Sequence, residues 1–442
     1  MKISWIDPIE LVQHELRQQR EQGGEVAPLQ QRWNDMQRVA LDENELRQHA
    51  LTLLHEIADM GAKPKRDEPS DIAEIAASRP ARQAPVANAA LSEIDLYDRI
   101  LGGWLGRAAG CALGKPVEKH PRAVIRQLLE SNGAWPLSDY ITAAGMPQEL
   151  LQKFPWNRHS GRESLRENLE CMPEDDDMNY PMLNLRVLEI YGLNFTTENI
   201  AECWLSMLPV LSTFTAERVA YLNLLQAWRP PQTATRCNPY REWIGAQIRA
   251  DLWGWISPGD PKTAAGRAWR DARLSHTGNG IYGEMFFAAA ISAAFVVSEP
   301  RQIIAQGLQQ IPQESRLAQA IEFVLALYDE EKNWEKAVDR LYEEFGHYHW
   351  VHTINNAALA AAALLYSDGD YERAICYVVM GGWDTDSNGA TVGSILGTMR
   401  GAKQLPEKWI APLHNRIRSS LKGFDNAAFD DLARRTMRQA VA

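Results

Sequence analysis

The stretch LGGWLGRAAGCALG spans residues 101–114, and the stretch GATVGSILGTMRG spans residues 389–401. Glycine recurs at every fourth position in both: Gly102, Gly106, Gly110 and Gly114 in the first, and Gly389, Gly393, Gly397 and Gly401 in the second. Positions four apart share one stripe of an α-helix. A glycine inside a helix costs ~1 kcal/mol relative to alanine, so close backbone packing is the natural reason for so many. The pattern predicts two buried central helices that can touch; the alternative is chance spacing in a chain rich in alanine and glycine.

The rest of the chain also has the pattern of helices. Apolar residues recur at helical spacing from residue 94 onward, and alternating runs of β-branched residues are almost absent. We therefore expect an all-α fold, a compact multi-helical domain with an N-terminal helical extension. The expected helices cover residues 94–113, 120–131, 178–191, 197–208, 215–228, 240–252, 263–273, 280–297, 300–310, 314–328, 333–345, 353–366, 370–380, 387–401 and 425–440.

Three segments of the chain differ in composition. Residues 1–60 have an amphipathic helical pattern, and residues 61–92 are rich in proline and alanine, with one short helix expected at residues 72–77. We interpret them as a helical extension and a linker that precede a catalytic domain over residues 93–442. The extension is expected to cover the surface of the main domain with its apolar face. Dimerisation and the binding of a partner are the alternatives.

Composition and charge restrict the classes of function. The chain has 442 residues and a formal net charge of −11, so we expect no stable nucleic-acid binding, which requires a basic face. No apolar run approaches the ~20 residues of a membrane span, and the N-terminal residues lack the apolar core of a signal peptide. We therefore expect no membrane association. The five cysteines are scattered without a CxxC pair, which indicates a reduced protein and a cytoplasmic location.

Two acidic clusters could hold a metal ion. The first is EDDD, residues 174–177, and the second is DTDS, residues 384–387. Each precedes a predicted helix, so helix capping explains one acid in each cluster. Adjacent acids also repel one another, and a bound cation offsets that repulsion. Carboxylate and hydroxyl oxygens suit Mg²⁺, Mn²⁺ or Ca²⁺ better than zinc, and on the residues alone both interpretations stay open.

Other combinations of reactive residues give weaker signals. His347, His349 and His352 are close in sequence, but residues two apart do not share a helix face, so we expect ordinary core or surface histidines. Ser275 and His276 are adjacent, which rarely gives the geometry of a nucleophile and its base. The sequence has no GxSxG, no P-loop and no GxGxxG motif, so a serine hydrolase and the common nucleotide sites are not expected.

Two specific motifs resemble those of the ADP-ribosylglycohydrolase family, the all-α hydrolases that include the dinitrogenase reductase-activating enzyme. The segment GWDTDSNGA, residues 382–390, resembles the family's GxDTD[ST]xxA metal motif. The segment from Ile100 to Glu118 resembles the opening helix, whose pattern is GxxxGDALG followed by PxE, with Cys111 where the family has aspartate. The resemblance extends from about residue 94 to the C-terminus.

Two further segments follow the same family in the same order. Asp175–Asp177 resembles a TDDT metal motif without its threonines, with Asp175 in the place of the first threonine; a shift by one residue that uses Glu174 is the alternative. Gly245–Arg249 and residues 275–283 resemble a GxxMR loop and a TH segment, although the GNG lead-in of the loop is missing.

The resemblance implies a role for each of these residues. The implied ligands of two Mg²⁺ or Mn²⁺ ions are Asp175, Asp176, Asp177, Asp384, Asp386 and Ser387. The implied catalytic groups are Glu118, Asp177 and Asp384. The implied contacts to ADP-ribose are Gly245, Arg249, His276, Tyr282 and Gly283.

The function implied by the resemblance is hydrolysis of the ribosyl C1 linkage of an ADP-ribosylated acceptor, a protein or a small molecule, with release of ADP-ribose. Such cleavage passes through an oxocarbenium-like transition state. One alternative is the same chemistry on a smaller ribosyl or nucleoside-like glycoside, which the missing GNG and the tryptophan-rich loops favour. Another is a relative without enzymatic activity, which the retained acids argue against.

Overall fold

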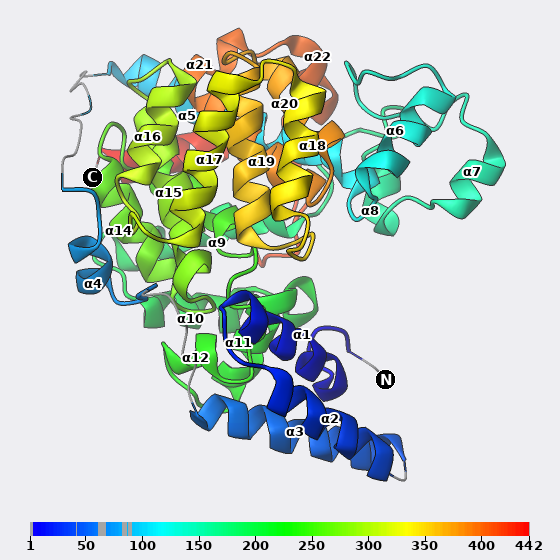
Figure 1. Ribbon diagram of the computed structural model, residues 1–442. Helices are drawn as coiled ribbons and strands as arrows, with labels where there is room; N and C mark the ends of the chain where they lie inside the picture. The colour runs from blue at the N-terminus through cyan, green and yellow to red at the C-terminus, as the bar shows by residue number, and fades with distance from the viewer. Residues whose placement is uncertain (1–2, 41, 61–67, 82–85, 87–90, 442) are drawn as a thin grey trace.

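The computed structural model of the protein describes residues 3–40, 42–60, 68–81, 86 and 91–441. Within them, helices dominate (Figure 1), and the strands β1 (Arg416–Ile417) and β2 (Ala427–Ala428) form one short antiparallel pair. The predicted all-α fold is confirmed. None of the described helices combines the length and the apolar character needed to cross a bilayer.

The helices follow one another closely along the chain. The N-terminal ones are α1 (Pro8–Glu21), α2 (Ala27–Val39), α3 (Glu43–Met60) and α4 (Ile72–Ala77). The next are α5 (Glu93–Gly114), α6 (Arg122–Ser131), α7 (Gln148–Lys153), α8 (Arg158–Glu163), α9 (Asp176–Tyr191), α10 (Thr197–Met207), α11 (Thr215–Leu225), α12 (Gln232–Thr235), α13 (Asp251–Trp255) and α14 (Pro261–Ala272). The last are α15 (Gly278–Ala294), α16 (Pro300–Leu308), α17 (Arg316–Glu330), α18 (Trp334–Phe345), α19 (Thr353–Tyr366), α20 (Tyr371–Gly381), α21 (Thr385–Arg400), α22 (Glu407–Ile410) and α23 (Phe429–Ala440). Short 3-10 helices are η1 (Lys115–Val117), η2 (Val210–Ser212), η3 (Gln247–Arg249), η4 (Ala402–Gln404) and η5 (Ala411–Leu413).

The glycine stripes of α5 and α21 face each other along the contact between these two buried helices. A Cβ atom added to Gly110 would lie 1.9 Å from the carbonyl oxygen of Gly389, and one added to Gly106 would lie 2.3 Å from that of Gly393. Only glycine permits backbones to approach so closely. The residue numbers rise in opposite directions along the contact, so the helices are antiparallel. The predicted contact between two buried central helices is confirmed.

The last glycine of each stripe has a different role. A Cβ atom on Gly114 would lie 2.1 Å from the carbonyl oxygen of Thr385, so this glycine brings the end of α5 against the start of α21. Gly401 lies just beyond α21 with a φ of 81°, and there it packs against the carboxylate of Asp98. A φ in this range suits a glycine that terminates a helix.

One expected helix is wrong. Residues 240–252 form turns, η3 and the beginning of α13 instead of one continuous helix. The reason is that the charged residues in this segment are buried and pair in different directions: Arg241 with Glu15, Glu242 with Arg316, and Arg249 with Asp271. A single helix would present residues 241, 242 and 249 at fixed angles around one axis, whereas turns let each side chain reach its own partner.

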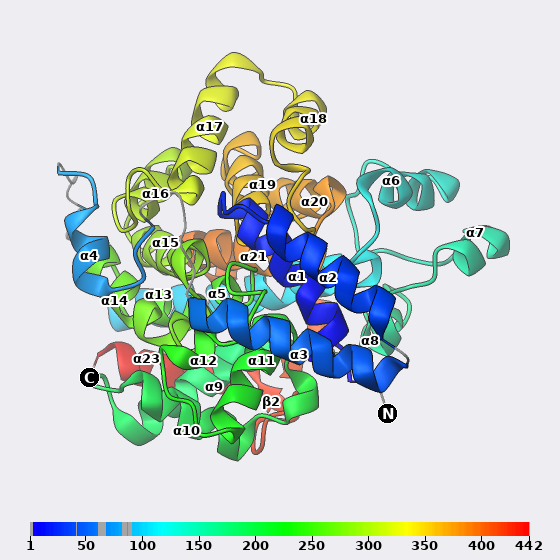
Figure 2. The ribbon, with the colours of Figure 1, turned by 60° about the horizontal axis from the view of Figure 1, so that its bottom comes forward.

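The helices α1–α3 lie at one end of the molecule, beside α11 and α12 (Figures 1 and 2). The buried face of α1 is partly polar, because it includes Glu15 and Gln18 as well as leucine and valine. Glu15 forms an ion pair of 2.8 Å with Arg241, and both side chains are 5% exposed. The division into extension, linker and catalytic domain stays a proposal, and residues 61–67, 82–85 and 87–90 of the expected linker lie outside the described residues.

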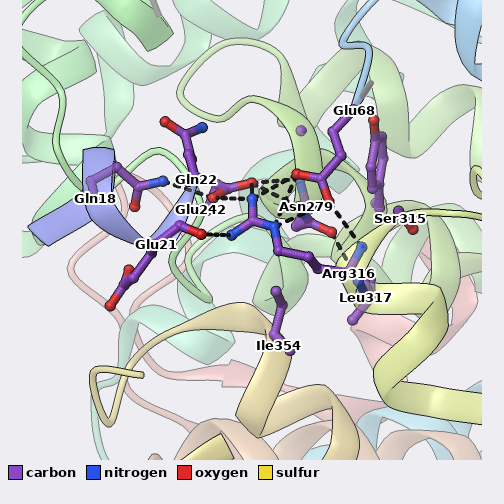
Figure 3. Close-up of polar contacts among 12 residues, drawn as sticks. Gln18, Glu21, Gln22, Glu68, Glu242, Asn279, Ser315, Arg316, Leu317 and Ile354 are labelled. Atoms are coloured by element: carbon purple, nitrogen blue, oxygen red, sulfur yellow. Dashed lines mark hydrogen bonds and ion pairs between the residues drawn. The ribbon is translucent and has the colours of Figure 1, made fainter. Parts of the chain in front are cut away.

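Arg316, the first residue of α17, joins the N-terminal helices to the rest of the protein (Figure 3). Its guanidinium donates to Glu68 at 2.6 Å and to Glu242 at 2.7 Å, and also to the backbone carbonyl of Glu21 at the end of α1. The side-chain amide of Gln18 in α1 donates to the Oε2 atom of Glu242 at 2.7 Å. Buried ionic contacts of this kind require a specific geometry, so they fix how α1 lies on the protein.

Glu242 stays ionised because of its partners. Burial acts to raise the pKa of Glu242. The electrostatic effects of Arg316 and His352, together with hydrogen bonds from Arg316 and Asn279, outweigh burial and lower the pKa to about 2. A carboxyl with a lowered pKa in the folded state stabilises the protein above its ordinary pKa. That stabilisation is lost as the pH falls from about 4.5 towards the folded value.

We expect Gly110→Ala to lower the free energy of unfolding by more than about 3 kcal/mol, because its methyl group would overlap the backbone of α21. Gly266→Ala in α14 is the matched control, since a Cβ atom there meets no atom within 4 Å. The control should be neutral or stabilising by up to ~1 kcal/mol. Urea unfolding followed by tryptophan fluorescence measures both. Equal stability of the two variants would contradict the packing described for α5 and α21.

Glu242→Gln should destabilise the protein at pH 6 much more than at pH 3. The wild type loses the contribution of this carboxylate as the pH falls through the window from about 4.5 to about 2, whereas the glutamine does not titrate. Urea midpoints at both pH values give the difference, and Glu407→Gln at an exposed position serves as control. If the difference in urea midpoint between wild type and Glu242→Gln were the same at both pH values, the ionised carboxylate of Glu242 would not be stabilising the protein.

Candidate metal centre and active site

The contact between α5 and α21 places three acidic residues together. The hydroxyl of Thr385 donates to the carbonyl oxygen of Gly114 at 2.7 Å, which fixes the end of α5 at the start of α21. The chain then turns through η1 to Glu118, while Asp384 and Asp386 lie at the start of α21. One carboxylate oxygen from each of Glu118, Asp384 and Asp386 lies within 4.8 Å of the others, and all three residues are buried.

This group of acids has the chemistry of a cation site. The pKa of Asp384 is raised well above its ordinary value by burial and by the negative charges of Asp386 and Glu118. The Oδ1 atom of Asp386 is buried and has no hydrogen-bond partner among the described residues. A divalent cation would satisfy that oxygen and remove the repulsion, and an all-oxygen donor set suits Mg²⁺ or Mn²⁺. The residues therefore fit the metal ion that the sequence motifs imply.

A second acidic group lies beside the first and has cationic partners of its own. Cys111, Asp175 and Asp177 each offer one ligand atom within 4.8 Å of the others. Asp175 forms an ion pair with Lys115, and Asp177 accepts a hydrogen bond of 3.2 Å from Arg107. The pKa of Asp177 is nevertheless raised well above its ordinary value, chiefly by burial, against the effect of Arg107 and with a further increase from Asp386. This group is therefore more nearly neutralised than the first.

The start of α9 also shows how capping and clustering of acids combine. Asp175 is the N-cap of α9 and accepts a hydrogen bond of 2.8 Å from the backbone N–H of Asp177. Asp176 and Asp177 then face the same pocket as Asp384 and Asp386. Glu174 accepts a hydrogen bond from Asn179 instead. Asp176 and Asp177 thus line the pocket, whereas Glu174 does not, and the register of the motif stays a prediction.

Residues of both acidic groups line one small pocket with a volume of about 50 Å³. Aromatic and aliphatic side chains line it as well. The lining residues are Trp5, Glu118, Lys119, Asp176, Asp177, Phe214, Thr215, Glu217, Ile244, Gly245, Ile248, Trp350, Val351, Asp384, Asp386 and Ser387. Among these described lining residues, Lys119 is the one lysine or arginine. Ser387 donates to Asp177 at 2.9 Å and so links the two acidic clusters.

Arg249, expected to contact phosphate, does not line this pocket. Its side chain is completely buried, with its Nη1 atom 2.8 Å from Glu217 and its Nε atom 3.0 Å from Asp271. Glu284 also contacts the guanidinium, at 3.6 Å. Burial acts to lower the pKa of Arg249, but these carboxylates raise it. The guanidinium is therefore enclosed by acids and has no face towards a ligand in this structure.

His276, Tyr282 and Gly283 also lie away from the pocket. His276 is buried, its Nδ1 atom lies 2.8 Å from the hydroxyl of Ser275, and its pKa is lowered well below the ordinary value by burial and by the charge of Arg249. Tyr282 donates to the backbone carbonyl of Pro69. Gly283 allows α15 to approach Thr353 of α19. Of the five expected ADP-ribose contacts, only Gly245 lines the described pocket, because the other side chains are used in packing between elements.

The described histidines near residue 350 make packing and capping contacts. The ring of His349 stacks on Trp243 at 4.2 Å, and burial lowers the pKa of His349 to about 3. His352 caps α19, where its ring nitrogen accepts from the backbone N–H of Ile354. Among the described residues, the groups able to hold a metal include none of these histidines. The expectation of ordinary core histidines fits these contacts.

Sequence reasoning missed Glu217 and Trp5 as pocket residues. Glu217 lies in the first turn of α11, and burial raises its pKa to about 7 although Arg249 acts to lower it. Gly245 makes room for this carboxylate, since a Cβ atom there would lie 2.1 Å from Glu217 Oε1. Nothing in the local sequence of Glu217 distinguishes it from a solvent-exposed helical acid. Trp5 lies more than a hundred residues before Glu118, in a segment without a known motif.

The chain is similar to one family of known proteins. The family model described as ADP-ribosylglycohydrolase matches residues 92–441. A solved structure described as an ADP-ribosylglycohydrolase-related protein complex is similar at 18% sequence identity, with a TM-score of 0.48, over 79% of this chain and 99% of its own. A comparison with curated proteins gives no match.

Arg249→Met should lower the free energy of unfolding by about 3–5 kcal/mol, because it leaves three buried carboxylates without their cation. Arg273→Met, at a half-buried position on the end of α14, is the control and should cost less than about 1 kcal/mol. Urea unfolding gives both values. If Arg249→Met were as stable as wild type and only bound ADP-ribose more weakly by calorimetry, the phosphate-binding role would be supported over the structural one.

Proposed function

The chain belongs to the ADP-ribosylglycohydrolase family, and from this premise we propose that it is a metal-dependent glycoside hydrolase that releases ADP-ribose from an ADP-ribosylated acceptor. Family membership supports a hydrolase that acts on ADP-ribose linkages. The observation that carries the metal dependence is the convergence of one carboxylate oxygen from each of the buried residues Glu118, Asp384 and Asp386 within 4.8 Å, together with the buried Oδ1 atom of Asp386, which has no hydrogen-bond partner among the described residues.

We assign the metal ligands to the acids that face the pocket. Asp384 and Asp386, with Glu118 close to them, would hold one Mg²⁺ or Mn²⁺ ion, and Asp176 and Asp177 would hold a second. Asp175 supports this second set from behind, because it caps α9 and pairs with Lys115, and Ser387 orients Asp177 through its hydroxyl. The ions, when bound, supply Lewis acidity towards water and towards the hydroxyls of the ribose.

The protein's own carboxylates suit cleavage at the anomeric carbon. The positive charge of an oxocarbenium-like transition state is stabilised by the negative charges of the acids that line the pocket. Glu118 accepts a hydrogen bond from the side-chain amide of Asn157, which orients its carboxylate. Glu118 then takes a proton from the attacking water as general base. The water oxygen bonds to C1, the bond from C1 to the acceptor breaks, and the leaving acceptor atom takes up a proton from solvent, to which Glu118 releases the proton that it accepted.

The alternative of a smaller ribosyl or nucleoside-like substrate keeps one argument in its favour. A diphosphate is usually bound by arginine, by lysine or by a helix N-terminus, and Lys119 is the one basic side chain among the described residues that line the pocket. Calorimetry with ADP-ribose and with ribose, each with and without Mg²⁺, separates the two. A protein that binds no metal at all would instead support a relative without enzymatic activity.

The proposed substrate is an ADP-ribosylated protein or a small ribosyl compound, in the cytoplasm. The location is inferred from the cysteines, since all five are free and three of them, Cys111, Cys203 and Cys376, are buried. Proteins in oxidising compartments more often pair their cysteines. The acidic balance of the chain argues against stable binding to nucleic acid.

Asp386→Asn should reduce hydrolysis of an ADP-ribosylated peptide by more than about a hundredfold and weaken Mn²⁺ binding by at least about tenfold, because it removes a ligand charge. Glu174→Gln is the matched control, since Glu174 belongs to the acidic run but bonds to Asn179 outside the pocket. Calorimetric titration with Mn²⁺ and a hydrolysis assay before and after EDTA measure both effects. Undiminished turnover in EDTA would rule out the metal-dependent mechanism.

A further inference from the structure

Trp5 lies just before α1 and lines the acidic pocket. Among the described residues before position 118, no other residue lines it. All other lining residues lie between positions 118 and 387. Trp5 is half-buried and packs against the hydrophobic core. It also precedes the region that matches the family, residues 92–441. The pocket is therefore completed by a part of the chain outside that region.

The contacts of Trp5 hold its ring in one place. The ring lies edge-on to Tyr240, at 5.6 Å between centroids, and to Trp243, at 6.0 Å. Both partners are buried. Arg218 donates to the backbone carbonyl of Ser4 at 3.0 Å, so α11, which carries Glu217 into the pocket, also holds the residue next to Trp5.

The backbone of Trp5 is strained, with a φ of 69°. A residue other than glycine rarely adopts such a value, and it persists only where the surrounding structure enforces it. That enforcement comes from the docking of α1, which begins at Pro8 and is held by Glu15 against Arg241 and by Gln18 against Glu242 (Figure 3). The position of Trp5 is thus determined by buried ionic contacts as well as by its own packing.

Aromatic rings and carboxylates line the same pocket. The aromatic residues are Trp5, Phe214 and Trp350, and the acids include Glu118, Asp177, Asp384 and Asp386. Such rings suit the apolar face of a sugar or the plane of a heterocycle. The volume of about 50 Å³ is far below the roughly 300–1,000 Å³ of pockets that enclose a drug-sized ligand. Trp5 therefore restricts the space on the side of the pocket where the N-terminal segment passes.

We propose that Trp5 is a specificity-determining residue of the active site: its indole contacts the substrate beside the ribose and limits the size of the acceptor that the site admits. The inference rests on the proposed function, because it presumes that the ribose is bound at the acids of the pocket. It assigns the N-terminal helices a role in substrate selection, through the placement of one side chain.

The test compares the full-length wild type with Trp5→Ala and Trp5→Phe on two substrates. One is a small ADP-ribosyl conjugate, and the other is a folded protein that carries ADP-ribose through the same linkage. For Trp5→Ala we expect KM for the small conjugate to rise about tenfold, the loss typical of a stacking ring, with kcat changed less than about threefold. We then divide kcat/KM for the ADP-ribosylated protein substrate by kcat/KM for the small conjugate. This ratio should rise by at least about tenfold in Trp5→Ala, and Trp5→Phe should give a ratio between those of wild type and Trp5→Ala.

A general loss of structure would lower both activities together and leave that ratio unchanged, so an unchanged ratio overturns the inference. Trp228→Ala is the matched control, a half-buried tryptophan that contacts Arg236 and does not line the pocket; its ratio should equal that of wild type. If wild type hydrolyses neither substrate, the proposed hydrolase function is rejected, independently of any role of Trp5. Calorimetry with ADP-ribose then decides about Trp5: weaker binding by Trp5→Ala supports its place in the site, and unchanged or absent binding rejects it.

Discussion

Contact between the backbones of α5 and α21 is the constraint on which the rest of the structure depends. Glycines on both helices remove the side chains that would separate them, so that Gly106 and Gly110 lie directly against Gly393 and Gly389. Each glycine weakens its own helix, and the burial of both helices along most of their length offsets that weakness. The same approach sets the end of α5 against the start of α21. Without it, Glu118 would not reach Asp384 and Asp386.

Around this contact the protein buries many charged side chains, and those at the candidate site and in the ionic networks fall into two kinds. Arg107, Arg249 and Arg316 are surrounded by carboxylates, and their networks hold elements together. Glu118, Asp384 and Asp386 converge on one another instead. The pairing of these arginines with carboxylates explains the architecture. The convergence of like charges, with the buried Oδ1 atom of Asp386 left without a hydrogen-bond partner among the described residues, indicates a ligand. Asp177 belongs to both kinds, because it accepts a hydrogen bond from Arg107 and also lines the pocket with Asp384 and Asp386.

Much of the fold could be predicted from local patterns. The periodicity of apolar residues located most helices, α19 with both ends in agreement, and the glycine spacing identified the central pair. The acids that line the pocket could be recognised from short motifs, because Asp176 and Asp177 are adjacent in sequence and Asp384 and Asp386 are two residues apart. Arg249 and Trp5 could not be placed, since the partners of Arg249 lie on α11, α14 and α15 and the pocket contacts of Trp5 lie far along the chain. The irregular path of residues 240–252 has the same cause, because long-range ionic pairing overrides a local helical pattern.

The central claim is that the junction of α5, α9 and α21 forms a divalent metal centre. The most direct measurement is anomalous diffraction at the manganese edge from crystals of the full-length protein grown with Mn²⁺. The account predicts anomalous density within about 2.5 Å of carboxylate oxygens of Asp384 and Asp386, with Glu118 or Asp177 completing the site. Anomalous density only at exposed acidic residues, or none at all at saturating Mn²⁺, would contradict it.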